Sequence, residues 1–104
     1  MSAFDVKVHP DAIAEANEAR RWYYDQNPSA ADKFDLEIEI AITTLLDSPE
    51  RWPRILGGHR RIRLRRFPFM IVYYVRGNDV FVIAIAHMHR RPGYWMDRGF
   101  HDKS

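Results

Sequence analysis

The first half of the chain has the pattern of one short strand followed by two helices. Apolar and polar residues alternate over residues 3–8, which predicts a half-buried strand. Over residues 11–26 apolar side chains recur every three or four positions, and a second such stretch runs to about Asp47. Asn27-Pro28-Ser29 separates the two stretches, because the residue before a proline disfavours helical dihedral angles. So short a connection predicts an antiparallel helical hairpin.

Local signals indicate where the two helices begin and which side the second one buries. Pro10 suits a helix start, and Asp11 can cap the first helix or complement its dipole. Ser29 and Asp32 resemble a capping box for the second helix. The spacing places the following side chains of that helix in the core: Phe34, Ile38, Ala41, Ile42 and Leu45. It places these acidic side chains in solvent: Asp32, Asp35, Glu37 and Glu39.

The second half has the pattern of three strands. A connector rich in proline and glycine at residues 48–58 precedes strand-like runs at residues 59–66, 69–75 and 80–88. Phe67-Pro68 and Gly77-Asn78 mark the turns between them. The element order β-α-α-β-β-β predicts an α+β fold. In it, the antiparallel helical hairpin packs on one face of a mostly antiparallel four-stranded sheet.

The last two runs are apolar on both faces, which a sheet covered on one side does not require. Either a segment of the chain covers the second face, or a partner does, because monomers rarely leave such a face bare. The tail with Tyr94 and Trp95 is the internal candidate, and an apolar peptide from another protein is the external one. For these two aromatic side chains, packing is favoured over a role as interface anchors.

Length and composition indicate one domain over residues 1–98, with residues 99–104 as a disordered tail. The absence of cysteine excludes disulfides, thiolate metal sites and a cysteine nucleophile. No apolar run approaches the ~20 residues of a transmembrane helix, and the N-terminal residues lack the features of a signal peptide. We therefore expect a cytoplasmic protein that does not associate with membranes.

The formal net charge of +2 conceals an acidic half and a basic half. Residues 1–50 carry four cations against eleven acids, a net charge of −7, whereas residues 51–104 carry twelve against three, a net charge of +9. Thirteen of the sixteen cations are arginine, whose planar fork binds phosphate and carboxylate groups. This asymmetry indicates either a polyanionic or acidic partner for the second half, or mutual neutralisation of the two halves in the fold.

Arginines concentrate in the first of the three predicted strands and after the last. Arg61, Arg63 and Arg65 recur with a period of two and should share one face, and Arg90 and Arg91 follow the last strand. They form either a surface for phosphates or an acidic protein segment, or a solvated edge strand that resists aggregation.

A second group has the residue types of a metal-independent ribonuclease. His87 and His89 should lie on one face of a strand, close to Arg90 and Tyr94. One such group can take a 2′-hydroxyl proton, another can protonate the leaving oxygen, and cations can hold the phosphate charge. The alternative is a packed His87 beside a solvated His89. A third ligand at a motif spacing is missing, so we expect no metal site.

Taken together, the chain resembles the RelE/ParE superfamily of type II toxin–antitoxin toxins. The resemblance extends from about Phe4 to Arg98 and rests on the element order and on local signatures in sequence. These signatures are Leu45-Leu46-Asp47-Ser48-Pro49, Gly58-His59-Arg60-Arg61, Phe67-Pro68-Phe69-Met70-Ile71-Val72-Tyr73, and Ala84-Ile85-Ala86-His87 followed by Arg90-Arg91-Pro92.

The resemblance implies a toxin of a plasmid stabilisation-type module, held inactive by a ParD- or RelB-like antitoxin in a hetero-oligomer. Such antitoxins wrap an amphipathic segment around the toxin, and no cofactor is implied. Members of the superfamily either inhibit DNA gyrase or cleave mRNA in the ribosome without a metal ion. The nuclease branch usually has arginine where this chain has Met70, so the resemblance is closer to the gyrase-inhibiting, ParE-like branch. An orphan or inactive member is a further alternative.

The same resemblance supplies candidate residues for both activities. If the chain is a nuclease, the catalytic candidates are Arg63, Arg65, His87, Arg90 and Tyr94. Residues expected to bind a target or an antitoxin are Arg61, Arg63, Arg65, Arg90, Arg91, Tyr94 and Trp95.

Overall fold

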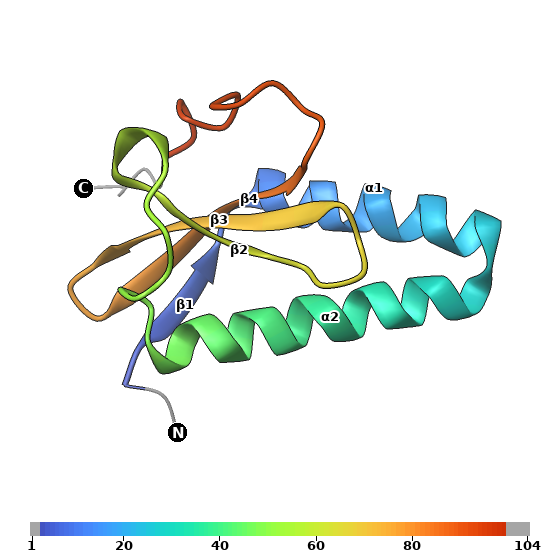
Figure 1. The fold of residues 1–104 in the computed structure, drawn as a ribbon, viewed down its shortest axis with the longest axis horizontal. Coiled ribbons are helices and arrows are strands. Elements are labelled where there is room, and N and C mark those ends of the chain that lie inside the picture. Colours follow the sequence, from blue (N-terminus) through green and yellow to red (C-terminus); the bar gives the residue numbers. More distant parts are fainter. Residues whose placement is uncertain (1–2, 100–104) are drawn as a thin grey trace.

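The computed structural model describes residues 3–99 and has the predicted order of elements (Figure 1). Strand β1 (Asp5–Val8) leads into helix α1 (Pro10–Gln26) and helix α2 (Pro28–Asp47). A single 3-10 turn, η1 (Leu56–Gly58), precedes strands β2 (Arg60–Arg63), β3 (Phe69–Arg76) and β4 (Asp79–His87). The α+β class is therefore confirmed, although the second strand ends at Arg63, three residues earlier than predicted. Residues 100–104 of the predicted disordered tail lie outside the described residues.

The helix starts differ from the sequence prediction because the residue before each proline forms the cap. The His9 side chain accepts a hydrogen bond from the backbone N–H of Asp11, so Asp11 lies in the first turn and is not the cap. Asn27 ends α1 and also caps α2, since its side chain accepts from the N–H of Ser29. The predicted Ser29 capping box is thus wrong, and one residue alone separates the two helices.

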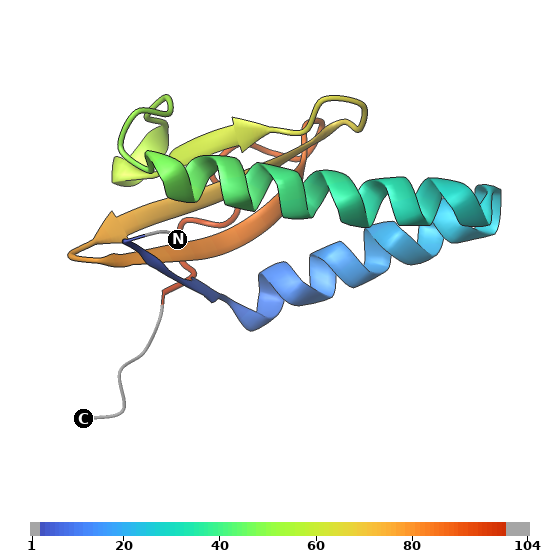
Figure 2. The same ribbon diagram turned by 90° about the horizontal axis from the view of Figure 1, so that it is seen from below.

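The sheet has the strand order β1-β4-β3-β2, with β1 parallel to β4 and the other pairs antiparallel. Both helices lie side by side on one face of it (Figure 2). This placement makes β2 an edge strand beside α2, which decides where a groove forms.

The pairing of β3 with β4 contains a bulge at Ile83. Val72 is opposite Ala84 but Tyr73 is opposite Val82, so Ile83 has no counterpart in β3. An extra residue reverses which side chains point to each face from there onward. Consequently Ile85 packs in the helix-side core, whereas Ala84 packs on the opposite face.

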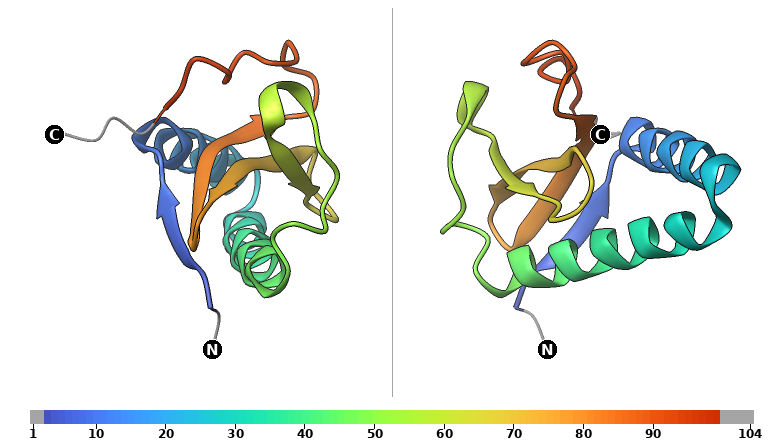
Figure 3. Two further views of the ribbon diagram at one scale, coloured as in Figure 1. Left: turned by 90° about the vertical axis from the view of Figure 1, so that its left-hand side faces the viewer. Right: turned by 45° about the vertical axis from the view of Figure 1, so that its right-hand side comes forward.

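The sheet therefore has two cores. The helix-side core joins α1 and α2 to the sheet through a cluster of fully buried residues: Ala12, Phe34, Leu45, Ile71, Tyr73, Val80 and Val82. The second face is covered by the chain's own tail (Figure 3). Trp95 is 2% exposed and packs on Val72, Ile83 and Ala86. Of the two predicted covers for this face, the structure has the internal one.

Among residues 3–99 no helix is long and apolar enough to cross a membrane.

Candidate partner-binding groove and the tail-side cleft

A groove of about 600 Å³ lies between α2 and the edge strand β2. Its floor is apolar and combines side chains from the helix, the connector and the strand: Leu36, Ile40, Ala41, Trp52, Pro53, Ile62 and Leu64. Figure 2 shows α2 running beside β2 along this side of the molecule. Large, mainly apolar concavities are where proteins usually bind their ligands, and this groove is a candidate site for that reason.

The helix contributes apolar side chains that the fold itself does not cover. Leu36 is 56% exposed and Ile40 is 52% exposed, one turn apart on α2. They lie outside the helical stripe that packs on the sheet, which includes Phe34, Ala41 and Leu45. Two large apolar side chains held together beside further apolar surface are typical of an interaction site, unlike single scattered ones.

Cations surround this floor. The groove is lined by five of them, Lys33, Arg61, Arg63, Arg65 and Arg66, and by one acid, Glu37. Within residues 3–99 the side chains of Arg61, Arg63 and Arg65 form no ion pair, so their charges are available to a partner. Mutual neutralisation of the two halves therefore does not extend to these arginines.

Glu37 has a structural role that the sequence did not reveal. It was expected in solvent, but its side chain is only 15% exposed. Its Oε1 accepts hydrogen bonds from the backbone N–H groups of Arg65 and Arg66 at 2.9 and 3.1 Å. The acid thereby fixes the loop after β2 against α2, and the neighbouring arginine side chains remain at the rim.

The backbone of β2 adds hydrogen-bonding groups to the groove. Ile62 pairs with Ile71 of β3, while the N–H of Arg61 points away from β3 and donates to the carbonyl of Pro53. Because these directions alternate along an antiparallel strand, the N–H and C=O of Arg63 also point outward. The groove thus offers apolar contacts, positive charge and a strand edge to one extended or helical segment.

A second concavity, of about 450 Å³, brings together three of the nuclease candidates. His87, Arg90 and Tyr94 line it with Trp22, Tyr23 and Phe69. The His87 ring packs at 5.0 Å from that of Phe69, and its Nδ1 accepts from the N–H of His89. The Arg90 guanidinium lies 4.0 Å from the centre of the Tyr94 ring.

Tyr94 is held by a carboxylate from α1. Its hydroxyl donates to Glu15 at 2.7 Å, and Glu15 also accepts from both terminal nitrogens of Arg98 and from the N–H of Ile85. Burial, followed by the hydrogen bond and charge of Glu15, raises the pKa of Tyr94 well above its usual value. The hydroxyl is therefore held protonated, as a donor within a structural network.

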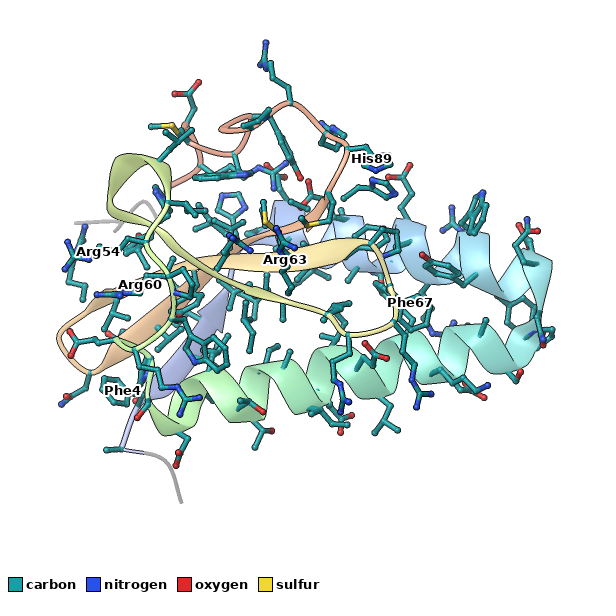
Figure 4. The ribbon with its side chains drawn as sticks, in the orientation of Figure 1. Phe4, Arg54, Arg60, Arg63, Phe67 and His89 are labelled. Carbon is teal, nitrogen blue, oxygen red and sulfur yellow. The ribbon has the colours of Figure 1, made fainter. Side chains whose placement is uncertain are left out.

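The remaining candidates are divided between the two faces of the sheet. Arg61 and Arg63 are opposite Val72 and Met70, which belong to the tail-side face. His87 packs on Phe69, which contacts the helix-side core. Arg63 projects from β2 and His89 from the turn after β4 (Figure 4). Arg91 is exposed, whereas Trp95 lies buried beneath the tail surface.

The sequence does not indicate the ion pair between Glu15 and Arg98. They are 83 residues apart, and neither carries a local motif. Glu15 was one of many acids on a helix, and the signal that could have set it apart was its position on the same face as the buried Ala12 and Ala19. No cluster of metal-ligating side chains occurs in the part of the chain that the structure describes.

Comparison with known proteins agrees with this geometry. The family model described as ParE toxin of type II toxin-antitoxin system, parDE, matches residues 6–92. A solved structure described as the chromosomal ParDE TA system from P. aeruginosa is similar, with a TM-score of 0.74 and 21% sequence identity. The match covers 84% of this chain and 98% of that one, and it shows the shared fold. No curated protein matches the sequence.

Proposed function

We propose that this chain, which belongs to the ParE toxin family of type II toxin–antitoxin systems, inhibits DNA gyrase and is neutralised by an antitoxin segment bound in the groove between α2 and β2. The observation that carries the antitoxin part of the proposal is the combination of exposed Leu36 and Ile40 with arginines that line the same groove. Three of these, Arg61, Arg63 and Arg65, form no ion pair within residues 3–99. An amphipathic segment with acidic side chains complements such a surface, since apolar contacts supply affinity and charge supplies orientation.

The choice of gyrase over mRNA is supported by the placement of the nuclease candidates. The register of the sheet separates Arg63 from His87, and the Tyr94 hydroxyl is occupied by Glu15. At the strand position where the nuclease branch carries arginine, Met70 packs against the tail-side core. A ribonuclease needs its acid, base and phosphate-binding groups within hydrogen-bond reach of one phosphate, and this arrangement disfavours that.

The gyrase proposal is tested by adding the purified chain to a DNA supercoiling reaction. We expect inhibition in proportion to the concentration of toxin, and reversal when the product of the adjacent short open reading frame is added. Undiminished supercoiling at a large excess of the chain would contradict the proposal. Growth without arrest on expression would favour an inactive or orphan member instead.

A parallel reaction with mRNA and ribosomes tests the alternative activity. If the chain were a RelE-type endoribonuclease, cleavage would occur without added metal and would be lost in His87→Ala and Arg65→Ala. Both side chains are peripheral to the two cores, so the variants should fold. We expect no cleavage by the parent chain.

A further inference from the structure

A small apolar platform lies on the opposite side of the molecule, where the loop around η1 meets the tail. We call it the loop–tail platform, and it consists of Leu56, Gly57, Gly93 and Met96. The two glycines have positive φ angles of 69° and 81°. A Cβ atom at Gly57 would lie 2.8 Å from Cε of Met96, and one at Gly93 would lie 3.3 Å from Cδ1 of Leu56. The two segments therefore interlock through positions that exclude a side chain.

The platform rests on a firm base. Trp95 lies beneath the tail with its ring 4.9 Å from that of His59, and both residues are buried. The Nδ1 of His59 is 3.0 Å from the carbonyl oxygen of Leu56, which ties the loop to this base. Glu15 holds the end of the tail through Arg98. The surface is thus organised before any partner arrives, which reduces the entropy lost on binding.

The two large side chains on this platform are nevertheless open to solvent. Leu56 is 53% exposed and Met96 is 45% exposed. The fold supports both side chains and leaves about half of each exposed. An apolar centre that is fixed in place and ringed by polar groups is the usual anatomy of a protein–protein contact, in which methionine and arginine are enriched.

The charged groups around the platform determine what kind of partner fits. The exposed charged residues within two positions of Leu56, Gly93 or Met96 are two arginines, Arg54 and Arg91, and one acid, Asp97. An excess of arginine next to an apolar centre complements an acidic surface that presents an apolar side chain. Duplex DNA would match the arginines but would leave Leu56 and Met96 without apolar contacts.

The platform is separate from the groove because the connector passes from one face of the sheet to the other. Trp52 packs against the helix-side core, whereas Ile55 packs against the tail-side core. Figure 3 shows the loop and the tail together, away from α2. A segment filling the groove would leave this platform uncovered.

From these observations we infer that the loop–tail platform is the surface through which the toxin contacts its target protein, by means of an acidic, partly apolar surface on that target. The inference rests on the proposed function to the extent that the chain acts on a protein target. It assigns toxicity and neutralisation to different faces of one small domain.

The test compares two matched leucines. Leu56→Asp and Leu36→Asp introduce the same charge at side chains of almost equal exposure, 53% and 56%, one on the platform and one in the groove. For each variant we would measure growth arrest on expression, and affinity for the full-length product of the adjacent open reading frame. We expect Leu56→Asp to abolish growth arrest with antitoxin affinity unchanged. We expect Leu36→Asp to weaken antitoxin affinity at least about tenfold with growth arrest retained.

Opposite outcomes would overturn the inference. Growth arrest by Leu56→Asp equal to that of the parent, or loss of antitoxin affinity in that variant, would exclude the platform as a target surface. Met96→Asp supplies a second variant, judged only when its circular dichroism matches the parent. If either variant loses affinity for linear duplex DNA in the absence of any protein target, the platform binds nucleic acid and the inference is wrong.

The same experiment separates this inference from the gyrase proposal. If the parent chain arrests growth without inhibiting supercoiling, the gyrase proposal fails, while the comparison of Leu56→Asp with Leu36→Asp still decides the role of the platform. If the parent arrests nothing, the platform has no target and the inference is overturned together with the proposal.

Discussion

The two faces of the sheet are covered by different means. The difference between them distinguishes side chains that stabilise the fold from side chains that remain exposed and can bind a partner. The helix side is covered by two long helices whose packing leaves Leu36 and Ile40 in solvent beside a basic edge strand. The tail side is covered by an irregular segment of about ten residues, held by one buried tryptophan and one carboxylate. Segments of the chain itself thus cover the apolar strands on both faces. The exposed apolar surface lies at the margins of the helical hairpin and of the tail segment.

The difference predicts that the tail segment on the second face of the sheet is held in place by only a few contacts. Trp95→Ala removes the central side chain of the tail-side core and should cost about 3–5 kcal/mol of unfolding free energy. Urea denaturation followed by circular dichroism measures this. Trp22→Ala is the control on the helix side: Trp22 is 58% exposed, and its loss should cost under about 1 kcal/mol. Equal losses of unfolding free energy in the two variants would mean that the packing of the tail does not depend on Trp95.

The next largest effect is expected at the carboxylate that holds the tail. Glu15→Ala leaves the Arg98 guanidinium, the Tyr94 hydroxyl and the N–H of Ile85 without their acceptor, and should cost about 3 kcal/mol. Unfolding free energy and limited proteolysis of residues 88–98 report the change. Glu18→Ala, an exposed acid one turn away, should lie within about 0.5 kcal/mol of the parent. A stable Glu15→Ala variant with a protected tail would contradict the network.

On the helix side a smaller effect is expected from Glu37. Glu37→Ala removes the acceptor for two backbone N–H groups after β2, and should cost about 1–2 kcal/mol. It should also weaken antitoxin binding, because the arginine rim is no longer fixed. Glu39→Ala is the exposed control, and titration calorimetry with each variant provides the affinity. An unaltered affinity in Glu37→Ala would show that the rim needs no fixed loop.

A further effect is expected in alkaline solution, where one tyrosine on each side contributes. Burial raises the pKa of Tyr73 to about 12, and the pKa of Tyr94 is also raised. The folded chain therefore keeps these protons after the unfolded chain, with an ordinary tyrosine pKa near 10, has lost them. The contribution of these two tyrosines to stability should be constant below pH 10 and should fall as the pH rises toward 12. Tyr73→Phe should reduce this loss of stability. Equal slopes of unfolding free energy against pH in the parent and the variant would contradict the contribution of Tyr73.

The sequence was sufficient for the architecture because local patterns determine it. The helical spacing, the two prolines that follow His9 and Asn27, and the glycine turn at residues 77–78 specify each element to within a few residues. The caps were misassigned because Asp11 and Ser29 are good capping residues, and only the position of the adjacent proline decides which residue takes that role.

The site could be predicted only in part, because its decisive contacts are remote in sequence. Arg61, Arg63 and Arg65 are recognisable from their period of two, and they do lie at the groove. The bulge at Ile83, which sends His87 to the helix side, has no signature in the run of apolar residues. The roles of Glu15 and Glu37 depend on partners 70 and 28 residues away. Leu36 and Ile40 were detectable, since they are apolar positions outside the buried stripe.

Hydrogen–deuterium exchange of the chain with and without its antitoxin tests the division between the two sides most directly. We expect the amides of β2 (Arg60–Arg63) and of α2 around Leu36 and Ile40 to exchange at least about tenfold more slowly in the complex. Residues 93–98 should exchange at the same rate with and without the antitoxin. Protection confined to the loop–tail platform, with β2 unchanged, would contradict the assignment of the groove to the antitoxin.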